Sequence, residues 1–179
     1  VFEDCIVELQ PNNTKRKVTG NMFGFAADPI SKVRVGIIGL GNRGNTLLEM
    51  FQYLVENEMA EVIALSDISE EKVTKAAEKL AVWQSKKPVL YHKSKTEWEK
   101  LVKRDDIDLV IIATPWDLHT PMAIYSMENG KHVGSEVPVA STIEDCWKII
   151  ETAECTQKHC MMMENCNYNE EELWVLNMI

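Results

Sequence analysis

Clustered positive charge, long apolar stretches and an export signal are all missing from this sequence of 179 residues. Its 19 lysines and arginines are outnumbered by 28 aspartates and glutamates, which gives a formal net charge of −9. Apart from the triplet Lys15–Lys17, which we interpret as solvated, no basic cluster is present. This balance argues against nucleic acid and against an anionic membrane surface as partners. No apolar run is long enough to span a membrane, and the first residues lack a basic region followed by an apolar one.

Paired cysteines are absent as well. The five cysteines are odd in number and contain no CxxC motif, which argues against a disulfide framework and a zinc ribbon. The group formed by His159, Cys155, Cys160 and Cys166 fits no common metal-ligand spacing. We therefore interpret the thiols as structural and expect no metal site.

The hydrophobic periodicity divides the chain into three parts. Residues 1–31 lack sustained periodicity and are expected to form an N-terminal extension that lies on the domain or is mobile. Residues 32–165 alternate apolar runs with helix-compatible stretches, which predicts an α/β fold with a doubly wound parallel sheet. Residues 166–179 are typical of the opening turns of a helix, and we expect a substrate domain, missing from this chain, to follow.

Six apolar runs mark the expected strands. They lie near Val33–Ile38, Val62–Ser66, Val89–Tyr91, Leu109–Ala113, His132–Ser135 and Cys160–Met163. Within the last of them, the run Met161–Met163 is expected to fill the core. Six strands of this kind make a full dinucleotide-binding domain.

The first apolar run ends directly in Gly39–Gly44, GLGNRG, which has the spacing of a dinucleotide-binding turn. Gly39 permits the tight turn out of the strand, and Gly41 lets the backbone approach a pyrophosphate. Gly44 allows the following helix to pack closely on the sheet. The free N–H groups and the dipole at the start of that helix favour a diphosphate. The turn therefore predicts a dinucleotide cofactor, although a nucleotide-free domain with a glycine turn is the alternative.

Asp67 follows the second apolar run and indicates which dinucleotide, NAD or NADP, the turn would bind. Its carboxylate is suited to accept the hydroxyl hydrogens of an adenosine ribose and would repel a 2′-phosphate. The residues just after it, Ile68–Glu71, offer no arginine or lysine to hold such a phosphate. The sequence therefore predicts NAD in preference to NADP.

Polar residues also follow the later strands, where the ligand crevice of an open parallel sheet lies. Trp116 either covers the nicotinamide side of the cofactor or packs on the sheet. His119 either bonds the cofactor or substrate or is held by the backbone at a helix start. Asp117 is expected to cap the helix that follows Pro115. Glu136 either lies beside the nicotinamide or is a simple strand-end charge, and Pro138 is a candidate for a cis peptide bond.

Several of these motifs, read together, resemble one family. The glycine turn, the stretch Ile107–Glu136 and Glu136-Val137-Pro138 resemble the N-terminal domain of the Gfo/Idh/MocA oxidoreductase superfamily. Within it, TPWDLH at Thr114–His119 and the segment His159–Tyr168 look most like glycoside hydrolase family 109, the NAD-dependent α-N-acetylgalactosaminidases. The resemblance runs from about Lys32 to the end of the chain.

Val137 separates this sequence from many sugar dehydrogenases of the superfamily, which carry Glu-Lys-Pro and use the lysine to assist proton removal. Valine has no proton to exchange, so a dehydrogenase that relies on that lysine is in doubt. Glu-Val-Pro resembles the family 109 form of the motif. That resemblance implies net hydrolysis: hydride transfer from sugar to NAD, elimination, water addition and return of the hydride, with no carboxylate pair.

The resemblance also implies a set of cofactor-binding residues. Besides the three glycines, it comprises Asn42, Arg43, Asp67, Trp116, Asp117, Leu118, His119, Glu136, Val137 and Asn165. Tyr168 is a candidate for proton transfer or sugar contact, with a structural role as the alternative. The main sugar-binding residues are expected in the domain that would follow.

Three functions remain open from the sequence. The leading one is the NAD-binding part of a glycosidase that acts on a small carbohydrate. The others are a sugar or polyol dehydrogenase with a relocated base and a non-catalytic NAD-binding module. A homo-oligomer formed through the following domain is left open. Exported relatives suggest a periplasmic location, for which this chain carries no signal.

Overall fold

The computed structural model describes residues 20–165 and 169–178, which form a parallel six-stranded sheet with helices on both faces. The strand order is β3-β2-β1-β4-β5-β6, and every neighbouring pair is parallel. This order, with the chain running outward from β1 in one direction and then from β4 in the other, is that of a doubly wound dinucleotide-binding sheet. The α/β fold class expected from the sequence is confirmed.

The strands are short, and each helix that connects two strands buries one of its own faces against the sheet. The strands are β1 (Val33–Ile38), β2 (Ala60–Ser66), β3 (Val89–Tyr91), β4 (Leu109–Ile112), β5 (His132–Ser135) and β6 (Cys160–Met162). The helices are α2 (Asn42–Glu56), α3 (Glu70–Leu80), α4 (Glu97–Val102), α5 (Trp116–Glu128), α6 (Ile143–Thr156) and α7 (Glu170–Met178). None of the helices in the described ranges is both long and apolar enough to cross a membrane.

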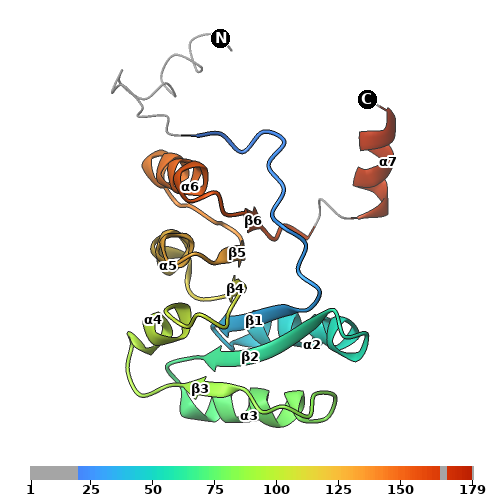
Figure 1. The fold of residues 1–179 in the computed structure, drawn as a ribbon, viewed down its shortest axis with the longest axis vertical. Helices are drawn as coiled ribbons and strands as arrows, with labels where there is room; N and C mark the ends of the chain where they lie inside the picture. The colour runs from blue at the N-terminus through green and yellow to red at the C-terminus, as the bar shows by residue number, and fades with distance from the viewer. Residues whose placement is uncertain (1–19, 166–168, 179) are drawn as a thin grey trace.

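Two hydrophobic layers hold the helices to the sheet. Leu47 and Leu48 of α2 pack with Val73 and Leu80 of α3 against one face. On the other face, α4, α5 and α6 pack with side chains such as Met127. Figure 1 shows this separation, with α2 and α3 on one side of the sheet and α4, α5 and α6 on the other. Because both faces are covered, the central strands are apolar throughout rather than alternating.

The described part of the N-terminal segment lies on the domain. It runs past β6, β5 and β4 before entering β1 (Figure 1). The ring of Phe25 packs on His159, with 4.9 Å between ring centroids, and Met22 contacts the core. Helix α7 stands apart from the sheet, and none of its described side chains is fully buried.

Some sequence-based details differ from the structure. β2 begins two residues earlier than expected, while β4 and β6 each end one residue earlier. The prediction that Met161–Met163 fills the core is wrong for its first two members, because Met161 and Met162 are exposed. They lie on β6, which pairs only with β5 and forms an edge of the sheet. Met163 alone packs against the core.

Candidate functional site

A cleft of about 710 Å³ opens at the carboxyl ends of the central strands. It lies where the chain changes direction between β1 and β4, the place where open α/β sheets bind ligands. The cleft is lined by the turn between β1 and α2, the end of β2, the loop after β3, and the turn between β4 and α5. Its volume falls within the roughly 300–1,000 Å³ that is usual for ligand sites.

The glycines of the turn have different surroundings. Gly39 has a φ of +90°, and a Cβ built on it would lie 2.5 Å from the carbonyl oxygen of Ala113. A Cβ on Gly44 would lie 1.9 Å from the carbonyl oxygen of Gly39. A Cβ on Gly41 would meet nothing within 4 Å, and Gly41 lines the cleft. Gly39 and Gly44 are thus required by the fold, whereas Gly41 leaves open space for a ligand.

Helix α2 starts at this open space. No side chain among the described residues caps its N-terminus, so the first N–H groups remain available toward the cleft. Asn45 instead fixes the turn itself, since its side-chain amide donates to the carbonyl oxygens of Leu40 and Gly41 at 2.8 and 3.1 Å. An uncapped helix start beside a glycine without steric neighbours fits a diphosphate.

Asp67 is held rigidly at the end of β2. Its Oδ2 accepts a hydrogen bond from the backbone N–H of Leu40 at 2.7 Å, and its Oδ1 accepts one from Ser69 at 2.9 Å. Each carboxylate oxygen keeps a further lone pair, and Asp67 lines the cleft. The carboxylate therefore joins the glycine turn to the start of α3 and remains able to accept ribose hydroxyls.

Three of the sequence-predicted residues come together from distant parts of the chain. The Arg43 Nε donates to Glu136 Oε1 at 2.6 Å, and another nitrogen of its guanidinium donates to the side-chain oxygen of Asn165. The Glu136 side chain is only 10% exposed, so Arg43 compensates a nearly buried charge. This connection ties the start of α2 to the ends of β5 and β6. The sequence indicated the three residues but carried no signal for their pairing.

His119 is fully buried and is bonded to the backbone. Its Nδ1 lies 2.8 Å from the carbonyl oxygen of Pro138, and its Nε2 lies 2.7 Å from that of Thr114. The ring thereby connects the β4–α5 turn to the loop that contains the cis peptide bond Val137–Pro138. Of the two interpretations of His119, the structure shows the backbone contact, and a cofactor contact stays a prediction. The expected cis bond is confirmed.

The prediction that Asp117 caps α5 is wrong. The helix begins at Trp116, with Pro115 at the cap position and no side-chain cap bond. Asp117 lies in the first turn, where a carboxylate favours the helix dipole, and its side chain lines the cleft together with Leu118. A cap residue precedes the first helical residue, whereas Asp117 is the second residue of the helix that follows Pro115.

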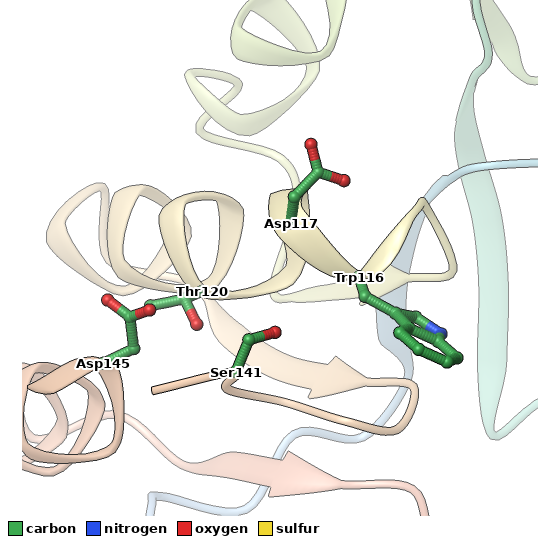
Figure 2. A pocket seen from close by; sticks show the side chains of 5 residues that line it. All are labelled: Trp116, Asp117, Thr120, Ser141 and Asp145. Carbon is green, nitrogen blue, oxygen red and sulfur yellow. The ribbon is translucent and has the colours of Figure 1, made fainter. Parts of the chain in front are cut away.

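Trp116 lies at a second, shallower pocket. Trp116, Asp117, Thr120, Ser141 and Asp145 line it, between the start of α5 and the start of α6. Figure 2 shows Trp116 at one end and Asp145 at the other, while Asp117 points away from Ser141. Trp116 is 68% exposed, so it does not pack on the sheet, and its proposed cover over the nicotinamide stays a prediction.

The cleft also contains residues that the sequence analysis missed. Lys72 of α3 and Ser94, Lys95 and Trp98 from the region after β3 line the same space as Asp67. The sequence argument for NAD considers only Ile68–Glu71, the four residues that directly follow Asp67, and these contain no lysine or arginine. The structure brings Lys72 and Lys95 to the cleft from one residue further along α3 and from the next β–α connection.

The remaining sequence-predicted residues give less information. Val137 is half-buried in the loop after β5. Tyr168 lies outside the described residues. Cys160 is largely buried, and this burial raises the pKa of its thiol to about 11, which fits a structural thiol.

Comparison with known proteins agrees with this geometry. Residues 33–164 match the sequence model of the Gfo/Idh/MocA family, described as an oxidoreductase family with an NAD-binding Rossmann fold. The chain is 48% identical over 159 residues to an alpha-N-acetylgalactosaminidase of Shewanella oneidensis, covering 89% of this chain and 34% of that protein. It is 46% identical over 165 residues to a glycosyl hydrolase family 109 protein of Shewanella sp. strain ANA-3, covering 92% of this chain and 35% of that protein.

Among solved structures, the fold resembles the WlbA dehydrogenase of Chromobacterium violaceum, crystallised with NADH and UDP-GlcNAcA. The TM-score is 0.71 at 26% identity, covering 84% of this chain and 41% of that one. The chain spans about a third of the length of the glycosidase relatives described above. The family match covers most of this chain and coincides with the sheet and its cleft. The chain therefore belongs to the Gfo/Idh/MocA oxidoreductase family, and residues 33–164 are its NAD-binding Rossmann domain.

Proposed function

We propose that this chain is the cofactor-binding part of a glycosidase that hydrolyses α-N-acetylgalactosaminides with NAD as a transient hydride carrier. The observation that carries the proposal is the 48% identity to a protein named alpha-N-acetylgalactosaminidase, over nearly the whole chain. The cleft supports it, because an uncapped helix start, the open space at Gly41 and the carboxylate of Asp67 suit NAD. A small carbohydrate is the corresponding substrate.

Each part of the cleft has a proposed task. The N–H groups of Asn42 and Arg43 hold the diphosphate, and Asp67 orients the adenosine ribose. Glu136 and Asn165, positioned through Arg43, orient the nicotinamide end. When bound, NAD supplies the acceptor and later the donor of a hydride, so the sugar is cleaved without net redox change.

Val137 favours hydrolysis over oxidation. It stands in the loop after β5 and offers no proton-transfer group, so this position supplies no base for net oxidation of a hydroxyl. We assign proton transfer or sugar contact to Tyr168, and the remaining sugar contacts to the part of the relatives' length that this chain does not span.

A sugar dehydrogenase with a relocated base is the second candidate, favoured by the structural likeness to the WlbA dehydrogenase. A full-length protein carrying this chain, incubated with 4-nitrophenyl α-N-acetylgalactosaminide, separates the candidates. Release of nitrophenol without accumulation of NADH supports the glycosidase. Stoichiometric formation of NADH from free sugars supports the dehydrogenase. If neither nitrophenol nor NADH forms, the result supports a non-catalytic NAD-binding module.

The cofactor assignment has its own test in the chain itself. Asp67→Ala removes the ribose acceptor and the partner of two backbone N–H groups, so we expect NAD affinity to fall by about tenfold or more. Isothermal titration calorimetry measures the change. Asp105→Ala is the matched control, because Asp105 is an exposed carboxylate that does not line the cleft. Equal NAD affinity in the Asp67 variant and the control would contradict the role of Asp67.

A further inference from the structure

The pocket between the starts of α5 and α6 contains an aromatic side chain that the cofactor cleft does not use (Figure 2). Trp116 lines this pocket of about 600 Å³, and 68% of the residue is exposed. Its two neighbours in the chain, Pro115 and Asp117, line the cofactor cleft, whereas Trp116 is not among the described residues that do so. The indole ring therefore offers an uncovered face to a ligand in the second pocket.

Polar groups lie at the opposite end of the pocket from the indole. Asp145 belongs to the first turn of α6, and the exposed Ser141 precedes this helix. The Asp145 carboxylate lies 3.9 Å from the ammonium group of Lys148, which lies closer to Glu144, at 2.8 Å. A carboxylate has about four acceptor positions, so Asp145 keeps several of them for a ligand.

The two carboxylates of the pocket are compensated by the helices that carry them. Asp117 lies in the first turn of α5 and Asp145 in the first turn of α6, where the positive end of the helix dipole offsets negative charge. This favours a neutral ligand with hydroxyl groups over a cation. An aromatic face beside carboxylate and hydroxyl oxygens suits a sugar, because the C–H face of a pyranose ring packs on an indole and its hydroxyls donate to carboxylates.

Asp117 lines both the pocket and the cofactor cleft, so the two spaces adjoin at this residue. We propose that the pocket is a saccharide subsite that holds the sugar attached to the anomeric carbon of the N-acetylgalactosamine unit, which is the part that leaves on hydrolysis. Trp116 packs against the ring of this second sugar, and Asp145 and Ser141 accept hydrogen bonds from its hydroxyls. The inference rests on the proposed glycosidase function and gives Trp116 a sugar contact in place of the cover over the nicotinamide.

The first test measures binding without turnover. The isotope-labelled chain is titrated with the disaccharide N-acetylgalactosaminyl-α-1,3-galactose, and the indole N–H signal of Trp116, assigned with Trp116→Phe, is followed by NMR. We expect this signal to shift, and we expect the Kd to rise about fivefold or more in Asp145→Ala. The matched control is Glu144→Ala, which removes the same charge from the same turn outside the pocket and should change the Kd less than about twofold. An unmoved Trp116 signal, or an equal effect of both variants, would overturn the proposal.

The second test measures hydrolysis by a full-length protein that carries this chain. It compares the same disaccharide with methyl α-N-acetylgalactosaminide, which has no second sugar. Asp145→Ala should lower kcat/KM for the disaccharide about fivefold or more, mainly through KM, and leave kcat/KM for the methyl glycoside within about twofold. An equal fall for both substrates would overturn the subsite, because the variant would then act through the fold or the cofactor. If Asp145→Ala shows no cooperative thermal transition, Ser141→Ala takes its place, since Ser141 is exposed.

The two proposals fail in different ways. Hydrolysis of the methyl glycoside without accumulation of NADH supports the proposed function, whatever the pocket binds. If neither glycoside is hydrolysed, the proposed function fails, and the NMR titration still decides whether the pocket binds a sugar. Tetramethylammonium chloride is the last probe, because an indole face beside carboxylates also attracts cations. A shift of the Trp116 signal with this cation but not with the disaccharide would make the pocket a cation site and overturn the saccharide subsite.

Discussion

Among single residues, Arg43 connects the start of α2 to two side chains that follow β5 and β6, Glu136 and Asn165. It is about one-third exposed, and it compensates Glu136, whose side chain is 10% exposed. Removing the partner of a fully buried charge costs about 3–5 kcal/mol, and partial exposure of this pair reduces that figure. We expect Arg43→Ala to lower the free energy of unfolding by about 1–3 kcal/mol, measured by urea denaturation.

A second substitution isolates the cause. Adding Glu136→Gln to Arg43→Ala removes the uncompensated charge, so at least half of the lost stability should return. Lys75→Ala is the control, because its pair with Glu71 is exposed and should contribute little to stability. A double variant no more stable than Arg43→Ala would show that packing, not charge compensation, explains the loss.

The glycines of the turn give a paired prediction at the same scale. In Gly44→Ala the new Cβ collides with backbone, so we expect a loss of about 1–3 kcal/mol in the free energy of unfolding. In Gly41→Ala the Cβ meets open space, so stability should stay within about 1 kcal/mol while NAD affinity falls. Denaturation and calorimetry on both variants test this contrast, and it fails if Gly41→Ala binds NAD normally.

At the scale of whole elements, the order of strands and helices could be predicted from the sequence, but the contacts between elements could not. Periodicity located all six strands because buried parallel strands are apolar on both faces. The same signal misplaced Met161 and Met162, since apolar runs do not reveal which strand is an edge. The six-residue helix α4 was not foreseen, because it is too short for a periodic pattern.

The candidate site shows the same limit. Gly39, Gly41 and Asp67 follow strand ends within one β–α–β unit, so local spacing was enough to predict them. Arg43 and Glu136 are 93 residues apart, and their pairing depends on the order of β1 and β5 in the sheet. Lys95 was missed for a similar reason, because only the fold brings the loop after β3 beside Asp67.

The contribution of the β5–β6 edge to the free energy of unfolding is expected to depend on pH. His132 begins β5, and its Nδ1 accepts a hydrogen bond from the backbone N–H of His159 at 3.0 Å. Burial lowers the pKa of His132 below its ordinary value of 6.5, positive charge on Lys158 and His159 lowers it further, and Asp108 opposes this. A lowered pKa in the folded state means that the neutral ring is favoured there. Its contribution to stability is therefore complete above about pH 6.5 and is lost as the pH falls through the folded pKa.

The measurement compares unfolding free energies between about pH 7.5 and pH 5. His132→Asn retains an acceptor near the position of Nδ1 and does not titrate, so its stability should decline less with acid than that of the unaltered chain. His92→Asn is the control, because His92 lies elsewhere, with its Nδ1 3.9 Å from the exposed Glu70 carboxylate. A decline that is equally steep in His132→Asn would remove His132 as the cause.

At the scale of the whole molecule, the cleft joins the two halves of the sheet. Its lining comes from the β1–α2 turn and the end of β2 on one side of the switch point, and from the β4–α5 turn on the other. The helices that follow these strands pack into separate hydrophobic layers on opposite faces. A dinucleotide in this cleft would therefore contact the segments that begin both layers, and binding should stabilise the domain as one unit.

Ligand linkage gives the size of that effect. A ligand that binds only the folded state at a hundred times its Kd adds about 2.7 kcal/mol, which raises the Tm of a domain of this size by roughly 5–11 °C. We expect NAD to produce this shift in a single cooperative transition followed by circular dichroism, and Asp67→Ala to reduce it at the same NAD concentration. Two separate transitions, with only one moved by NAD, would mean that the halves unfold independently. The cofactor would then stabilise one side of the switch point rather than bridge both.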